Sequence, residues 1–260
     1  MSVRLDKVSW NTGEIFMTYL YRILAGMLCV VAMSAAGVAQ VYPRWFLEPA
    51  GIQGAAAGYT QNFFLQTSSD SAAFMRACEN LARQHYTEFR GGEAYWETEA
   101  GVYWMGDNFT ETIDSTFLTR ALSKAKQVAK YSNKSMTMML VSANDLAIPD
   151  SMFAAIRCPL EQPGWVEDVP QSSGYICAEG VASQYFYESS SWEAAEKRAR
   201  FNLARSMKVT LETMQKVGDG SGQEIRNEEV SEALHDIEVV YRWRDVKRGL
   251  YYVLMRTESK

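Results

Sequence analysis

The chain has 260 residues, of which 47% are hydrophobic, 22% charged and 12% aromatic, and this composition is typical of a globular protein. Its formal net charge at pH 7 is −5, and it has no basic stripe interleaved with aromatic residues, which argues against a nucleic-acid-binding protein. The length fits one or two domains, and the apolar content is enough to bury two modest cores.

The first 39 residues resemble an export signal. Residues 23–39 carry no charge and follow Arg22, and their small-residue end (Gly-Val-Ala) offers a cleavage site before Gln40. Met17 offers an alternative start. The uncharged run is shorter than the roughly 20 residues of a membrane span, although an uncleaved signal anchor is the competing interpretation. We therefore expect a periplasmic or outer-membrane-associated protein that has no integral membrane span after signal cleavage.

An internal repeat organises the rest of the chain. Gly58–Arg83 aligns without a gap on Gly180–Arg205, and twelve of the 26 aligned residues are identical. Such self-similarity predicts two copies of one small domain, at 40–157 and 174–260, joined by a Pro-containing linker at 158–173. We expect an α+β fold with two tandem copies of a β-α-β-α-β-β module, each with helices packed on one face of a small, mostly antiparallel sheet.

In the first copy, the pattern predicts a strand at Ala57–Leu65 and a helix from Asp70 with small and apolar residues on one stripe. An aromatic segment falls where the second strand is expected. The elements expected after it are a helix with its apolar face over 117–128 and strands at Met136–Ser142 and Met152–Arg157.

In the second copy, a strand at Tyr175–Tyr187 precedes a helix whose start has a capping-box pattern, with Ser190 as N-cap and Glu193 three residues later. The remaining elements are expected in chain order as a strand at Met207–Val217, a loop at Gly218–Gly222, a short helix at Glu228–His235, a strand at Ile237–Trp243, a turn at Asp245–Gly249 and a strand at Leu250–Met255.

Residues suited to catalysis or metal binding are sparse. His85 and His235 each lie near the end of a predicted helix, where the helix dipole favours histidine. Cys78 and His85 are seven residues apart, about 10.5 Å along a helix axis and too far for a nucleophile–base pair. No Cys/His spacing predicts a metal site. We therefore expect a protein that is not an enzyme and has no catalytic residue, metal or cofactor.

Two cysteines flank the predicted linker. Cys158 closes the first domain and Cys177 opens the second, and an exported protein is exposed to oxidising conditions. A disulfide between them is therefore one expectation, and three separate thiols, including Cys78, are the alternative.

The segments that the two copies do not share are candidates for interaction with a partner. One is the aromatic segment, which could form a subunit contact, a carbohydrate platform or part of the core. Another is the hairpin of the second copy with its arginines. The candidate residues are Tyr95, Trp96, Tyr103, Trp104, Arg242 and Arg244.

The second copy resembles a known family. A Gly-x-Ala strand within Gly174–Ser183, an Arg-Ala-x-x-x-Leu-Ala helix within Ala194–Arg205, and the ending Tyr241–Met255 are similar to the Lpp-twenty family of bacterial envelope lipoproteins. The module is also similar to that of flagellar outer-membrane-associated proteins of the FlgP and FlgT kind. The resemblance implies a non-enzymatic part of a ring or disc around the flagellar basal body, or another envelope assembly factor.

These observations together predict an exported scaffold or assembly protein of the bacterial cell envelope. Its expected partners are other envelope or flagellar proteins and further copies of itself, and not nucleic acid. A periplasmic ligand- or glycan-binding module is the alternative, with the aromatic segment as its binding surface.

Overall fold

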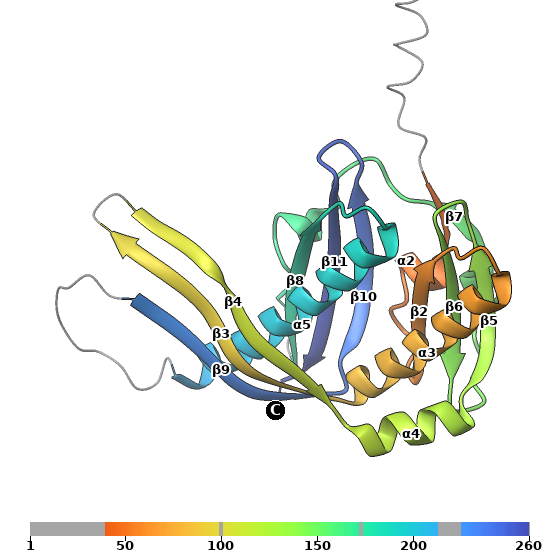
Figure 1. Ribbon diagram of the computed structural model, residues 1–260, viewed down its shortest axis with the longest axis horizontal. Coiled ribbons are helices and arrows are strands. Elements are labelled where there is room, and N and C mark those ends of the chain that lie inside the picture. The colour runs from red at the N-terminus through yellow and green to blue at the C-terminus, as the bar shows by residue number, and fades with distance from the viewer. Residues whose placement is uncertain (1–39, 99–100, 172–173, 213–224, 260) are drawn as a thin grey trace, which may run out of the picture. The chain divides into compact units, whose positions relative to one another are not determined.

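The computed structural model describes residues 40–98, 101–171, 174–212 and 225–259, which belong to one compact unit (Figure 1). The fold is mixed α+β, with small antiparallel sheets and four α-helices among these residues. None of these helices is both long and apolar enough to cross a membrane. The predicted export signal at 1–39 and the predicted loop at Gly218–Gly222 lie outside the described residues.

The first half of the described chain contains three of the helices. Its elements are β1 (Val41–Pro43), α2 (Arg44–Leu47), β2 (Ala55–Gln61), α3 (Gln66–His85), β3 (Tyr86–Thr98), β4 (Gly101–Ile113), α4 (Ser115–Lys124), β5 (Lys126–Ser132), β6 (Met136–Ser142), the 3-10 turn η1 (Asp150–Phe153) and β7 (Ala155–Arg157).

The second half is built around one long helix. Its elements are the 3-10 turn η2 (Gly164–Val166), β8 (Tyr175–Ser183), α5 (Glu188–Glu212), β9 (Ile225–His235), β10 (Glu238–Asp245) and β11 (Leu250–Glu258).

The two halves form sheets with the same strand order. In the sheet β2-β6-β5, the strand that comes last in the chain, β6, lies in the middle and pairs with both β2 and β5. The sheet β8-β11-β10 repeats this arrangement. Helix α3 packs on the first sheet and α5 on the second (Figure 1). A third sheet, β4-β3-β9, takes strands from both halves, and β1 pairs with β7.

Each helix approaches the first strand of its sheet at a glycine. A Cβ atom on Gly58 would lie 2.1 Å from the Ala77 backbone nitrogen and 2.2 Å from the Ala73 carbonyl oxygen. A Cβ atom on Gly180 would lie equally close to the backbone of Ala195 and Ala199. Because only glycine and alanine leave room for this contact, the repeated small residues set the distance between helix and sheet.

Polar side chains repeat the same correspondence. The amide of Asn80 donates to the Ala57 carbonyl at 2.8 Å, and that of Asn202 donates to the Glu179 carbonyl at 2.7 Å. Each asparagine therefore ties its helix to the strand beneath it, at positions that match in the sequence alignment.

The core is continuous between the halves. Phe46 in α2 packs edge-to-face on Tyr59 in β2, with ring centroids 5.4 Å apart, and on Trp192 in α5 at 5.6 Å. Trp192 in turn packs on Tyr251 in β11 at 4.8 Å. Since all four rings are buried, α2 acts as an apolar bridge between the two helix–sheet pairs.

The predicted linker at 158–173 packs against the second sheet. The Pro159 carbonyl accepts a hydrogen bond from the Trp243 indole at 2.8 Å, and Trp165 stacks on Tyr241 with centroids 6.4 Å apart. The segment is therefore part of the compact unit rather than a free spacer between two separate bodies.

The predicted starts of both main helices are wrong. Helix α3 begins at Gln66 rather than Asp70, and α5 begins at Glu188, so Ser190 lies inside the helix. The next residue, Ser191, makes the hydrogen bond that shapes this region. Ser191 Oγ accepts the backbone N–H of Tyr185 at 2.8 Å, so it secures the loop before the helix instead of capping the helix itself.

Two predictions near the end of the chain are also wrong. The predicted strand at Met207–Val217 continues α5 as far as Glu212. The predicted helix at Glu228–His235 is strand β9, which pairs with β3. Val230 and Leu234 are both buried, and their spacing of four residues equals two strand periods as well as about one helical turn, so the pattern fits both.

Smaller differences concern the ends of elements. Helix α4 ends at Lys124, and Val128, expected on its apolar face, lies in β5. The expected strand at Met152–Arg157 begins inside the turn η1, and its last three residues form strand β7, which pairs with β1 rather than joining the sheet of β2. The predicted strands at Met136–Ser142 and in the closing hairpin are confirmed as β6, β10 and β11.

We predict that Gly58→Ala and Gly180→Ala each lower the free energy of unfolding by about 3 kcal/mol, because the added methyl group meets helix backbone that cannot rotate away. Urea unfolding followed by circular dichroism measures this. Gly164→Ala is the matched control, since a Cβ there meets nothing within 4 Å. Equal effects at all three positions would contradict the close-approach argument.

Candidate functional site

A buried ion network joins the two halves. Arg242 in β10 is 4% exposed and binds Glu196 in α5 through two of its nitrogens, at 2.6 and 3.0 Å. Its third nitrogen donates to the Phe46 carbonyl, and its guanidinium lies 4.5 Å from the centroid of the Phe46 ring. Arg242, a predicted interaction candidate, is therefore used inside the unit, where its side chain is not part of the surface.

The network continues toward the third sheet. Arg200 in α5 donates to Glu111 in β4 at 2.6 and 3.3 Å and lies 3.8 Å from Glu196. Arg83 in α3 lies 3.7 Å from Glu111. Burial alone would raise the pKa of the Glu111 carboxyl, but the charge and hydrogen bonds of Arg200, with help from Arg83 and Lys197, hold that pKa below its ordinary value. The cluster holds β4 against both main helices.

A second polar cluster surrounds Glu188 at the start of α5. This buried carboxylate accepts hydrogen bonds from Gln40 at 2.7 Å, from the Trp192 indole at 3.3 Å and from the hydroxyls of Tyr42 and Ser135. Burial, followed by the charge of Glu188, raises the pKa of Tyr42 far above its ordinary value. Tyr42 therefore stays a neutral donor, which suits a structural clamp.

Arg244, the other predicted arginine, lies at the edge of this cluster. Its guanidinium donates to the side-chain amides of Gln40 and Gln184 and lies 3.8 Å from Glu188. It also covers the face of the Tyr251 ring at 4.9 Å. Gln40 is the first described residue, and its hydrogen bonds to Glu188 and Arg244 hold it against the rest of the unit.

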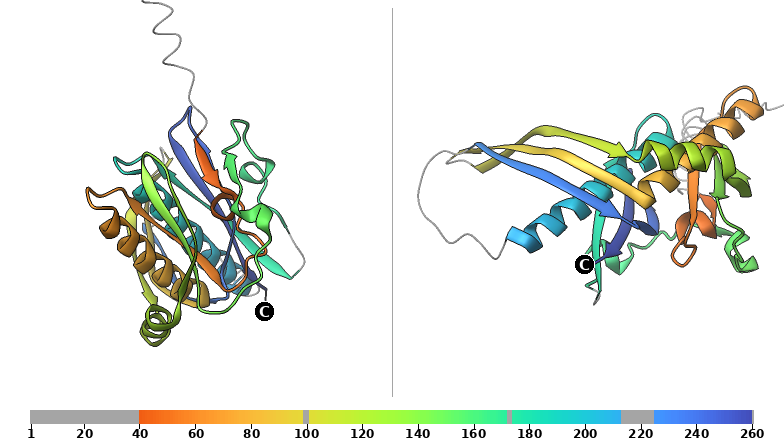
Figure 2. Two further views of the ribbon diagram at one scale, coloured as in Figure 1. Left: turned by 90° about the vertical axis from the view of Figure 1, so that its right-hand side faces the viewer. Right: turned by 90° about the horizontal axis from the view of Figure 1, so that it is seen from below.

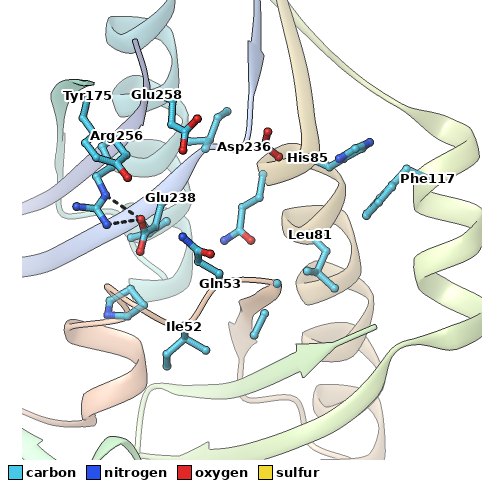
Figure 3. A pocket seen from close by; sticks show the side chains of 16 residues that line it. Ile52, Gln53, Leu81, His85, Phe117, Tyr175, Asp236, Glu238, Arg256 and Glu258 are labelled. Atoms are coloured by element: carbon cyan, nitrogen blue, oxygen red, sulfur yellow. Dashed lines mark hydrogen bonds and ion pairs between the residues drawn. The ribbon is translucent and has the colours of Figure 1, made fainter. Parts of the chain in front are cut away.

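A pocket with a volume of about 330 Å³ lies where α3, the loop before β2 and the second sheet meet (Figure 3). Its charged groups come from β10 and β11, where Arg256 binds Glu238 at 2.6 and 2.7 Å and faces the Tyr175 ring at 4.6 Å. Ile52 and Leu81 supply apolar lining. The guanidinium is thus already neutralised by Glu238, which weakens the pocket as an anion site.

The pocket also contains the turn that connects β9 to β10. Asp236 adopts a left-handed backbone conformation with φ of 50°. The following Ile237 N–H donates to the Gln84 carbonyl at 2.8 Å and so satisfies one of the carbonyls left free at the end of α3. The structure thus ties the second half of the chain to the helix of the first.

Each of the two histidines packs against an aromatic ring. His85 stacks on Phe117 with centroids 4.2 Å apart, and His235 packs against Tyr86 at 5.1 Å. Within the part of the chain that the structure describes, no group of three His, Cys, Asp or Glu side chains is placed to hold a metal ion.

Among the described residues, Cys78, Cys158 and Cys177 are separate thiols, so the structure has no bridge between Cys158 and Cys177. Cys158 lies beside Arg244 at one end of β10, whereas Cys177 pairs with Arg256, whose side chain binds Glu238 at the other end of that strand. Six strand residues span about 20 Å, while a disulfide needs Cα atoms within about 7 Å. Burial raises the pKa of the remaining thiol, Cys78, to about 11.

The structure brings the four predicted aromatic residues together along the third sheet. In the register of β3 and β4, Tyr95 lies opposite Trp104 and Trp96 lies opposite Tyr103. All four therefore occupy one short stretch of a hairpin whose strands extend away from α3 and α5 (Figure 1). Sequence spacing predicted a strand here, and the pairing of the two aromatic dipeptides across the hairpin is the new information.

Sequence reasoning missed the acidic residues that hold the arginines. A signal for one of them exists, because Glu196 and Arg200 stand four residues apart on a helix, where opposite charges attract. Glu188 and Glu111 give no such signal, since their partners come from distant segments.

Comparison of the chain with known protein families, curated proteins and solved structures gives no match.

We predict that Glu111→Gln lowers the free energy of unfolding by about 3 kcal/mol at pH 7, because Arg200 loses its main partner in a buried site. The folded-state pKa of Glu111 is lowered, so its stabilising effect is complete above the ordinary value of 4.5 and is lost as the pH falls through the lowered pKa. The difference between wild type and variant should therefore shrink in acid.

Urea unfolding at a series of pH values measures this difference. Glu161→Gln, at an exposed position, is the control and should change little at any pH. A difference that is independent of pH would show that Glu111 acts through packing rather than through its charge.

Proposed function

We propose that the protein is an exported, non-enzymatic scaffold or assembly protein of the bacterial cell envelope that self-associates through its third sheet. The observation that carries this proposal is the long hairpin of β3 and β4 with β9 beside it, which extends beyond the two helix–sheet pairs (Figures 1 and 2). We call this sheet the β-arm.

The geometry of the β-arm suits strand-to-strand assembly. Strands β3 and β4 have 13 residues each and β9 has 11, and 13 strand residues span about 43 Å. In the described part of the chain, β4 has β3 on one side and no strand on the other. A long edge of this kind presents backbone N–H and C=O groups to which a strand of a partner can add.

The repeated architecture supports a scaffold further. We infer that the sheets β2-β6-β5 and β8-β11-β10, each with its helix, are tandem copies of one module. The glycine contacts at Gly58 and Gly180 and the asparagine bonds of Asn80 and Asn202 occur at matching positions in both. In this interpretation the two helix–sheet pairs form the structural core of the protein, and the β-arm is the part that binds partners.

The cellular setting of the proposal comes from the sequence. The export pattern at 1–39 supports a location in the periplasm or at the outer membrane, and the resemblance to flagellar outer-membrane-associated proteins suggests a ring or disc around the basal body as one such assembly. Other envelope or flagellar proteins and further copies of this chain are the proposed partners.

A ligand- or glycan-binding module is the second candidate. It is favoured by the same stretch of the β-arm, where the backbone register pairs Tyr95 with Trp104 and Trp96 with Tyr103. Aromatic side chains with a polar tip are common contact residues for proteins and sugars alike, so this candidate requires an experiment that separates it from self-association.

We predict that the double variant Trp96→Ala/Trp104→Ala raises the dissociation constant of the self-assembled protein at least about tenfold, because interface tryptophans carry a large share of binding energy. Light scattering over a range of concentrations measures the mass. Phe153→Ala, at an exposed residue of η1, is the matched control.

The two candidates give different results with this variant. An unchanged mass together with lost affinity for peptidoglycan fragments would favour the binding module. A wild-type chain that stays monomeric at all concentrations and recovers no envelope partner would overturn the scaffold proposal.

We predict that the protein isolated from the envelope begins at Gln40, because the small residues before it form the signal-peptidase pattern. Mass spectrometry of the intact protein measures its mass and hence its first residue. A chain that retains residues 23–39 would instead establish the signal-anchor interpretation.

A further inference from the structure

Two loops at matching positions of the repeat expose large apolar side chains. Phe64 lies between β2 and α3 and is fully exposed, and Phe186 lies between β8 and α5 and is 92% exposed. Each is flanked by two further exposed apolar or aromatic residues. We call the two triplets the apolar tips: Phe63, Phe64 and Leu65 in one, and Tyr185, Phe186 and Tyr187 in the other.

The fold holds both tips outward by the same contact. The Phe63 N–H donates to Ser69 Oγ at 2.8 Å, and the Tyr185 N–H donates to Ser191 Oγ at 2.8 Å. Both serines are fully buried at the base of their helices. Because a buried hydroxyl fixes each loop, the fold itself holds both tips in their exposed positions. Clustered exposed apolar side chains mark interaction surfaces.

A chain of hydrogen bonds places both tips at one end of the unit. Asn62, beside the first tip, donates to the Asn133 carbonyl at 2.8 Å in the turn between β5 and β6. Gln40 donates to Ser135 in the same turn. Arg244 binds both Gln40 and Gln184, the latter beside the second tip. The left view of Figure 2 shows the loops before α3 and α5 near the turn between β10 and β11.

The charges at this end are mainly basic. Lys134 lies in the turn between β5 and β6, and Lys247 and Arg248 lie in the turn between β10 and β11, and all three are exposed. The nearby Asp245 accepts two backbone N–H groups of its own turn, at 2.9 and 3.0 Å, and lies 3.6 Å from Arg248. Asp70 is bound by Lys130 at 2.6 Å.

Gln40, the first described residue, lies at the same end. It is held by Glu188, Ser135 and Arg244, between the two tips. Two apolar tips and exposed basic residues are therefore found at one end of the unit.

We propose that this end of the unit docks on the surface of a lipid bilayer that contains anionic phospholipid, with both apolar tips inserted among the headgroups. Aromatic side chains prefer this interfacial layer, and lysine and arginine are attracted to anionic lipid. Either attraction alone is weak, and two together give stable binding. The inference does not depend on self-association, because α5 runs about 37 Å from the second tip toward the β-arm (Figure 1).

The experiment introduces tryptophan at one tip of the full-length chain at a time. Phe64→Trp and Phe186→Trp are mixed with phosphatidylethanolamine–phosphatidylglycerol vesicles, with or without brominated acyl chains, and the signal of the wild-type chain is subtracted. Brominated lipid should quench the added fluorescence at both tips. Leu122→Trp is the matched control on α4, where the side chain is also exposed, and it should not be quenched.

A binding measurement completes the test. Phe64→Ser/Phe186→Ser should lower vesicle binding on the order of tenfold, whereas Leu122→Ser should leave it unchanged, and all variants begin at the same residue as the wild-type chain. Equal quenching at 64, 186 and 122, or no quenching at the tips, would overturn the proposal. So would a blue-shifted signal at the tips without vesicles that accompanies a doubled mass, because the occupant would then be a second copy.

Discussion

The contact of the buried Arg242 guanidinium with Phe46 is the interaction on which the arrangement of the two halves depends. Two similar helix–sheet pairs could bury their apolar faces in several relative orientations. Arg242 is already paired with Glu196 within the second half, but its third nitrogen also needs the Phe46 carbonyl from α2, and most other orientations would leave this buried donor without a partner. The aromatic contacts of Phe46 with Tyr59 and Trp192 then fill the space around the charge.

Helix α5 connects this buried contact to the two ends of the unit where the proposed interaction surfaces lie. Helix α5 contributes Glu188 near its start, Glu196 in the middle and Arg200 further on, and each binds a different neighbour. The helix therefore binds Gln40 near its start and strand β4 further along. The apolar tips and the β-arm lie at these two ends, so the two proposed surfaces are separated by the length of the best-anchored helix.

The sequence predicted the α+β class of the fold. Identical small residues in Gly58–Arg83 and Gly180–Arg205 predicted the small-residue stripes of two helices, and the close approach of each helix to a glycine explains why those residues are small. Prediction failed where periodicity was ambiguous or where the partner was distant. Val230 and Leu234 fit a helix as well as a strand, and only pairing with β3 decides between them. The capping-box pattern at Ser190 is local, yet the neighbouring Ser191 forms the hydrogen bond that shapes the loop.

The candidate site was less predictable than the fold. The aromatic segment was found because its residue types are conspicuous, but its cross-strand register depends on a bulge between Ala94 and Tyr95 that no local pattern reveals. Arg242 and Arg244 were found as a pair, although they serve different clusters. Their side chains act within the unit because Glu196 and Glu188 reach them from another element, and sequence separation hides such partners.

The β-arm has a consequence for how the protein folds. Its central strand, β3, is made early, whereas β9 comes from the second half, so that Tyr86 pairs with His235. Closing so long a loop is entropically costly, and it must wait until most of the chain is available. A partly synthesised or truncated chain therefore has a β3–β4 hairpin without its third strand. The third strand of the β-arm can therefore pair only after the chain has been made as far as His235.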